Sequence, residues 1–108
     1  MFLLRKAKID TTKKVLVYGA SGSVGSYAIQ LARHMGKSVT GVCSSHNIAM
    51  VKSLGADEVI DYKKQDYTTL SAGFDIVFDA VGKTTKAAAK KVLAKGGSFV
   101  SVSMMTSE

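Results

Sequence analysis

The feature that most constrains the fold is a glycine-rich segment, residues 19–25, which separates an apolar run from a helical pattern. The run at residues 15–18 is short and apolar, as expected of a buried parallel strand. From Ser23 onward, apolar residues recur at three- and four-residue spacing and predict one face of a helix that Gly36 ends. The residues of that face are Val24, Ala28, Leu31 and Met35. The glycine-rich segment is therefore predicted to join a strand to a helix.

A glycine turn in this position is typical of sites that bind nucleotide phosphates. Residues 19–25 read Gly-Ala-Ser-Gly-Ser-Val-Gly and match the dinucleotide-binding pattern G-x-G-x-x-G, with alanine at its first position. Gly22 would let the backbone approach a pyrophosphate closely, and Gly25 would let the helix pack against the sheet. Free amides and the positive end of the helix dipole would face the negative charge. The alternative is that these glycines only form a tight turn.

The rest of the chain repeats the alternation of strand and helix. Further apolar runs predict strands at residues 38–43, 58–61, 74–79 and 98–102. One helix is expected to bury the face formed by Ile48, Val51 and Leu54 and to end at Gly55. A short helix is expected at residues 66–70, and another at residues 85–95, where Gly96 and Gly97 would end it. Parallel neighbours need long right-handed crossovers. We therefore predict an α/β fold, a Rossmann-type doubly wound parallel sheet of about five strands in the order 3-2-1-4-5 with helices on both faces.

The end of the second predicted strand bears on which nucleotide binds. Domains that bind NAD place an Asp or Glu there, about 20 residues after the glycines, to accept hydrogen bonds from the ribose hydroxyls. Here no carboxylate occurs between residues 11 and 56, and Ser44, Ser45 and His46 follow the strand. These side chains can donate hydrogen bonds to a 2′-phosphate without repelling it, so NADP is predicted in preference to NAD. Ser44 or Ser45 is also expected to cap the next helix, and His46 is as readily an idle surface residue.

Three other nucleotide-related classes are disfavoured by the same residues. The triplet Gly36-Lys37-Ser38 resembles the end of a P-loop, but it follows a helix and lacks the required preceding glycine. No tyrosine is followed four residues later by lysine, which removes the catalytic pair of short-chain dehydrogenases. Methyltransferases that use S-adenosylmethionine generally bind the ribose through an acidic residue at the end of the second strand, and that residue is missing here. The dinucleotide hypothesis remains the leading one.

Length, charge and cysteine content limit what else the chain can be. A chain of 108 residues accommodates one compact domain. The net charge of +7 comes from scattered lysines, which is more typical of solvated helix faces than of a nucleic-acid surface. One cysteine, Cys43, and two histidines cannot form a tetrahedral zinc site, and a single cysteine suits the cytoplasm. No apolar run reaches the length of a signal-peptide core or a membrane span, so we expect no membrane partner. The scattered lysines and the missing zinc ligands likewise lead us to expect no nucleic-acid partner and no metal.

The chain resembles the zinc-independent quinone oxidoreductase branch of the medium-chain dehydrogenases. The likeness runs from about Lys13 to Val102 and is carried by residues 19–25, 28–32, 54–62, 74–82 and 96–97. The resemblance implies pyrophosphate contacts at Ser21, Gly22, Ser23 and Val24 and 2′-phosphate contacts at Ser44 and Ser45. It also implies that Tyr62 lies beside the adenosine and that Val81 and Gly82 line the nicotinamide side. His46 stands where arginine is expected in close relatives, and Tyr62 has the alternative of an ordinary aromatic residue at a strand end.

The resemblance also implies a reaction. The parent enzyme would transfer hydride between NADPH and a quinone, an enal or another activated carbonyl acceptor, its small-molecule substrate. Residues 1–108 would be its dinucleotide-binding domain, excised from a longer enzyme, without the catalytic domain, without catalytic residues of its own and inactive alone. The alternative is a non-catalytic dinucleotide-sensing or scaffold module. The fifth strand would present an open sheet edge through which a homo-oligomer forms.

Overall fold

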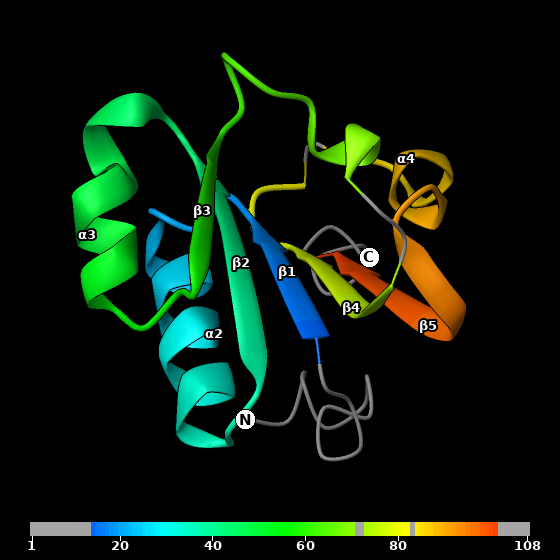
Figure 1. Ribbon diagram of the computed structural model, residues 1–108, viewed down its shortest axis with the longest axis horizontal. Coiled ribbons are helices and arrows are strands. Elements are labelled where there is room, and N and C mark those ends of the chain that lie inside the picture. The colour runs from blue at the N-terminus through cyan, green and yellow to red at the C-terminus, as the bar shows by residue number, and fades with distance from the viewer. Residues whose placement is uncertain (1–13, 71–72, 83, 102–108) are drawn as a thin grey trace, which may run out of the picture.

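The computed structural model describes residues 14–70, 73–82 and 84–101, which form a parallel sheet covered by helices (Figure 1). The sheet has five strands in the order β3-β2-β1-β4-β5, and every neighbouring pair is parallel. The strands are β1 (Lys14–Tyr18), β2 (Ser38–Cys43), β3 (Glu58–Asp61), β4 (Phe74–Asp79) and β5 (Leu93–Ser101). The helices are α2 (Ser23–His34), α3 (Ile48–Ser53) and α4 (Lys86–Lys90). The predicted fold class and strand order are confirmed.

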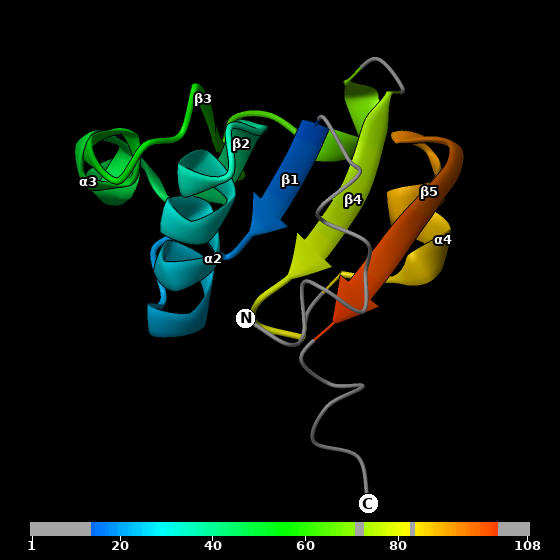
Figure 2. The ribbon, with the colours of Figure 1, turned by 90° about the horizontal axis from the view of Figure 1, so that it is seen from below.

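Alternate residues of the central strand β1 face opposite sides of the sheet. Val15 and Val17 lie in one buried cluster with residues of α2 and α3. Leu16 lies in a second buried cluster with Ala89 of α4. Figures 1 and 2 show α2 and α3 beside β2 and β3, and α4 beside β5. Helices therefore cover both faces, as predicted, and the carboxyl ends of the strands meet at one edge of the sheet.

The face of α2 that packs on the sheet is built from small residues and differs in part from the predicted face. Its buried residues are Gly25, Ala28, Ile29 and Ala32. Leu31 and Met35 are partly buried beside this cluster. Val24, however, is 42% exposed, so its assignment to the buried face was wrong. Successive helical residues point about 100° apart, and with Gly25 turned inward Val24 points to solvent.

A helix forms within the predicted segment 85–95, but its predicted end and the predicted role of Gly96 and Gly97 were wrong. Helix α4 ends at Lys90, and both glycines belong to β5. The register of β5 against β4 shifts just after Phe74. A Cβ atom on Gly97 would lie 2.9 Å from the carbonyl oxygen of Phe74. The glycines therefore permit a bulge at a close approach between two strands, and they do not stop a helix.

Smaller differences concern segment ends. The expected short helix at 66–70 is a single 3₁₀ turn, Tyr67–Thr69. The predicted fifth strand began at Ser98, whereas β5 begins at Leu93, and Val102 lies outside the described residues. Helices α2 and α3 end before Gly36 and Gly55, as predicted. Among the described residues, no helix is both long enough and apolar enough to cross a membrane.

Candidate functional site

Hydrogen bonds hold the turn between β1 and α2 against β2 and against itself. The amides of Gly19 and Ala20 both donate to the carbonyl oxygen of Val42, each at 3.0 Å. The Gly22 amide donates to the Gly19 carbonyl oxygen at 3.2 Å, and the Ser26 amide donates to the Gly22 carbonyl oxygen at 2.8 Å. The turn is therefore anchored on the neighbouring strand before the helix begins.

The first turn of α2 offers backbone hydrogen-bond donors. The first amides of a helix have no acceptor within the helix, and in α2 these belong to Ser23, Val24 and Gly25. Gly22 occupies the N-cap position, where no side-chain hydrogen bond forms, and the first turn of α2 contains no acidic residue. Ser23 and Val24 are exposed. The partial positive charge of this helix start is thus neither capped nor neutralised, and it suits an anion.

Gly22 and Gly25 have different physical roles. A Cβ atom on Gly25 would lie 2.2 Å from the carbonyl oxygen of Gly19, so the helix can begin this close to the turn only with glycine there. A Cβ atom on Gly22 would lie 3.6 Å from the same oxygen, which is an ordinary contact. The fold itself therefore does not require glycine at position 22. A ligand that approaches the exposed backbone there would require it, because a methyl group would stand in its path.

Beyond the end of β2, the described residues 44–47 carry hydroxyl, imidazole and amide groups and no acidic group. Ser44 occupies the N-cap position of the 3₁₀ turn Ser45–Asn47, as predicted, but its side chain forms no capping hydrogen bond. Instead, the Asn47 side-chain amide donates to the Ser44 hydroxyl oxygen at 3.1 Å. This contact orients the Ser44 hydroxyl while leaving its proton available to donate. Ser45 and His46 are exposed.

A cavity of about 260 Å³ lies between these two segments, at the carboxyl ends of β1, β2, β3 and β4. It brings together four of the predicted site residues, Ser21, Ser44, Tyr62 and Val81. Its remaining lining residues are Gly19, which belongs to the glycine-rich segment, and Tyr18, Val42 and Cys43, which the sequence did not indicate as site residues. The sequence could have indicated these residues, because they lie at the ends of predicted parallel strands, and such ends converge at one edge of the sheet.

The other predicted site residues do not line this cavity. They are exposed, and they are Gly22, Ser23, Val24, Ser45, His46 and Gly82. Each is a sequence neighbour of a lining residue or lies in the same turn as one. The structure therefore brings four of the ten predicted site residues together in this cavity.

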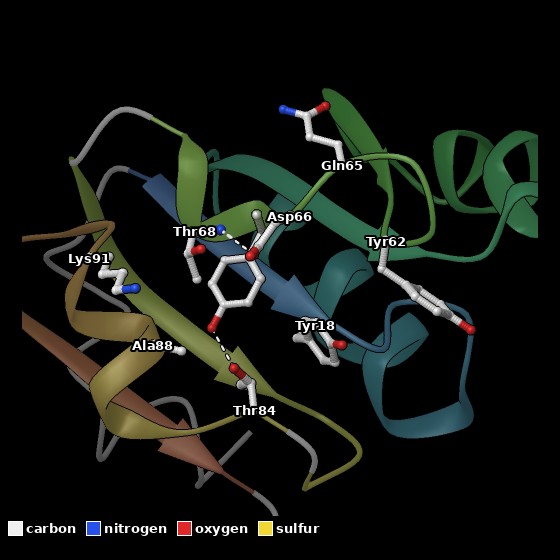
Figure 3. A pocket seen from close by; sticks show the side chains of 9 residues that line it. Tyr18, Tyr62, Gln65, Asp66, Thr68, Thr84, Ala88 and Lys91 are labelled. Carbon is white, nitrogen blue, oxygen red and sulfur yellow. Dashed lines mark hydrogen bonds between the residues drawn. The ribbon is translucent and has the colours of Figure 1, made fainter.

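A second cavity, of about 430 Å³, shares Tyr18 and Tyr62 with the first (Figure 3). The rings of Tyr18 and Tyr67 lie 5.5 Å apart between centroids, tilted by 59°. The hydroxyls of Tyr67 and Thr84 are hydrogen bonded, and Asp66 accepts from the Thr68 amide at 2.9 Å. The other residues that line this second cavity are Gln65, Ala88 and Lys91. Only the position of Tyr62 was predicted, because the others come together through crossovers that sequence spacing does not reveal.

The titratable groups around the two cavities favour binding over nucleophilic chemistry. Burial raises the pKa of the Tyr18 hydroxyl, with a smaller contribution from the Asp79 charge. Burial also raises the pKa of the Tyr67 hydroxyl, although its hydrogen bond to Thr84 acts in the opposite direction, so both hydroxyls stay neutral at physiological pH. Burial also raises the pKa of the Cys43 thiol, which disfavours the reactive thiolate. The hydrogen bond from the Thr68 amide lowers the pKa of Asp66, which is therefore charged. These cavities thus offer neutral hydroxyls, aromatic faces, one carboxylate and the amine of Lys91.

A protein-family model described as zinc-binding dehydrogenase matches residues 23–108. The 2-methylene-furan-3-one reductase of Solanum lycopersicum is 43% identical over 99 residues, which are 90% of this chain and 25% of that protein. The chloroplastic NADPH-dependent alkenal/one oxidoreductase of Arabidopsis thaliana is 39% identical over 101 residues, which are 92% of this chain and 26% of that protein. The chain spans about a quarter of the length of these curated relatives.

Solved structures give the same result for the fold. The quinone oxidoreductase from Coxiella burnetii superposes with a TM-score of 0.84 at 34% identity. The match covers 93% of this chain and 32% of that one. The cavity at the carboxyl ends of the strands therefore lies in a fold that this oxidoreductase shares.

Proposed function

Because the chain belongs to the zinc-binding dehydrogenase family, we propose that it is the dinucleotide-binding domain of an NADP-dependent oxidoreductase. In the whole enzyme, hydride would pass between NADPH and a quinone, an enal or another activated carbonyl acceptor. The names of two similar proteins support this, one an NADPH-dependent alkenal/one oxidoreductase and the other a quinone oxidoreductase. The observation that carries the proposal is the uncapped first turn of α2 beside the bare backbone of Gly22.

Three groups of residues would hold the cofactor. The pyrophosphate would accept hydrogen bonds from the turn formed by Ser21, Gly22, Ser23 and Val24. The 2′-phosphate would accept from Ser44, Ser45 and His46. Tyr62 would flank the adenosine, and Val81 and Gly82 would lie at the nicotinamide end. The exposed apolar surface of Tyr62 and Val81 would be covered by the ligand, which favours binding.

Magnitudes indicate that several donors must act together. A charge at an exposed helix start gains about 0.3–1 kcal/mol, whereas a micromolar Kd corresponds to roughly 8 kcal/mol. No single amide accounts for such affinity, so the serine hydroxyls and the apolar contacts are needed as well. When bound, NADPH supplies the hydride, and the contribution of these residues is to bind and orient it.

Zinc, which the family description implies, does not fit the described residues. They contain no group of three or more His, Cys, Asp or Glu side chains that could hold a metal ion. Cys43 is buried. The described residues are therefore proposed to bind the cofactor without a metal ion.

Titration with NADPH and NADH tests the proposed function directly. We expect NADPH to bind about tenfold or more tightly, because each hydrogen bond to a charged phosphate contributes roughly 1.5–3 kcal/mol. Exposed charges are screened by salt, so the margin should shrink as ionic strength rises. Calorimetry or nicotinamide fluorescence measures both affinities. Equal affinities, or tighter binding of NADH, would remove the assignment to NADP.

The edge of the sheet motivates a proposal about assembly. Within the described residues, β5 pairs only with β4, so its outer edge has no strand partner there. Unpaired backbone groups on an edge strand favour pairing with another strand, and we propose that a second copy provides it. Sedimentation velocity should then show a dimer fraction that increases with protein concentration. A monomer throughout the accessible concentration range would contradict this proposal.

A further inference from the structure

The carboxylate of Asp79, at the end of β4, is the most completely buried charged group in the described part of the chain, with 0% of the residue exposed. Its Oδ1 accepts hydrogen bonds from the amides of Val81, at 3.1 Å, and Gly82, at 2.8 Å. Its Oδ2 accepts from the Thr84 amide at 2.9 Å, and the Ser101 hydroxyl lies 3.5 Å from the same oxygen. Both oxygens are therefore engaged in holding the turn that follows β4.

This turn contributes to both cavities. Val81 lines the smaller cavity and packs against the phosphate-binding turn, because a Cβ atom on Gly19 would lie 2.7 Å from a Val81 methyl carbon. Thr84 lines the larger cavity, where its hydroxyl is hydrogen bonded to that of Tyr67 (Figure 3). The two carboxylate oxygens thus serve different walls, Oδ1 the Val81 side and Oδ2 the Thr84 side.

A buried carboxylate is a poor choice if stability alone is needed. Its desolvation is unfavourable, and an apolar residue of similar volume often gives equal or greater stability. What a carboxylate provides is several directional hydrogen bonds that allow one turn geometry. In the proposed binding mode, Val81 and Gly82 of this turn face the nicotinamide end.

We propose that Asp79 is a positioning residue that fixes the Val81–Gly82 backbone for the nicotinamide half of the dinucleotide. This inference rests on the proposed function. Asp79 itself does not reach the ligand, because it is fully covered. Its effect should therefore be much larger for ligands long enough to reach the turn than for ligands that contact only the 2′-phosphate site near Ser44.

Two ligands of different length test this with the Asp79→Asn variant. NADPH spans the whole site, whereas 2′,5′-ADP contains only the adenosine and its phosphates. Asparagine matches aspartate in volume but replaces one acceptor oxygen with a donor NH₂, so at least one amide of the turn loses its acceptor. We expect the Kd of NADPH to rise about tenfold and the Kd of 2′,5′-ADP to change less than about twofold. Calorimetry on the 108-residue chain gives both constants.

The matched control is Asp75→Asn, the same chemical change on the same strand. Asp75 accepts from the Lys14 amide at 3.0 Å, at the opposite end of β4 from the site. Both Kd values should stay as in the wild type. An Asp79→Asn variant that leaves both ligands unaffected, or weakens both equally, overturns the positioning role.

If Asp79→Asn does not fold, hydrogen exchange of the wild-type protein decides. NADPH should slow exchange of the Val81 and Gly82 amides more than 2′,5′-ADP does, since only the longer ligand reaches the turn. Equal slowing by the two ligands overturns the inference. If the wild type binds neither ligand, the proposed function fails and the inference fails with it, whereas unchanged affinities in Asp79→Asn refute the role of Asp79 alone.

Discussion

Replacing Gly25 with alanine is expected to lower the free energy of unfolding by about 3 kcal/mol or more, the upper end of the usual cost of overpacking. The new Cβ atom would lie 2.2 Å from the carbonyl oxygen of Gly19 and 3.0 Å from the Cα of Ala20. Both are backbone atoms, so no side-chain rotation relieves the contact. Either α2 or the turn must move, and the hydrogen bonds from the turn to Val42 would be strained. Urea unfolding followed by circular dichroism measures the change.

The same change at Gly22 should have a different result. Its backbone is extended, with a φ of −75°, and the new Cβ atom would meet only the Gly19 oxygen at 3.6 Å. Loss of glycine at an N-cap costs less than about 1 kcal/mol, so Gly22→Ala should remain folded. The methyl group would stand above the helix start, and we expect the Kd of NADPH to rise at least about tenfold. Unchanged affinity in this folded variant would contradict the close approach of the pyrophosphate at Gly22.

Introducing a carboxylate at the end of β2 should reverse the nucleotide preference. Ser44 lines the cavity and its hydroxyl is oriented by Asn47, so Ser44→Asp would place a negative charge where we propose that the 2′-phosphate binds. Two like charges about 4 Å apart repel by roughly 1 kcal/mol in bulk water and by roughly 4 kcal/mol near a protein surface. NADPH should therefore bind about fivefold to a thousandfold more weakly. NADH, whose ribose hydroxyls can donate to the carboxylate, should bind more tightly.

The uncharged variant Ser44→Asn separates charge from size. It has nearly the same volume as Ser44→Asp and should weaken NADPH much less, with no gain for NADH. Parallel titrations of both variants at low and high salt measure the electrostatic part, which salt should reduce. If the two variants behaved alike, the 2′-phosphate would not lie near Ser44.

The strand order could be predicted from the sequence because each strand is a short apolar run with its own crossover, and parallel topology follows from that alternation. Residues 93–97 show where such reasoning fails. Their alanine, lysine and glycine residues continue a local helical pattern that two glycines would end, whereas the structure places them in β5, paired with β4. Pairing with a distant strand outweighed local propensity there.

The candidate site divides in the same way. The turn at residues 19–25, where we propose that the pyrophosphate binds, could be predicted from local sequence, because its glycines lie between a strand and a helix. The Asn47 contact with Ser44 and the bonds from Asp79 required coordinates, since many side chains could occupy those positions. The contact between Tyr67 and Thr84 joins a residue that precedes β4 in the sequence to one that follows it, and no periodicity in the sequence predicts this contact.

One carbonyl oxygen, that of Val42, accepts hydrogen bonds from two successive amides of the turn between β1 and α2, and Ser44 follows only two residues later. These hydrogen bonds join two segments that are distant in sequence. Such a surface is preorganised: its donors have already lost their conformational freedom when the protein folds, and little entropy remains to be lost when a ligand arrives.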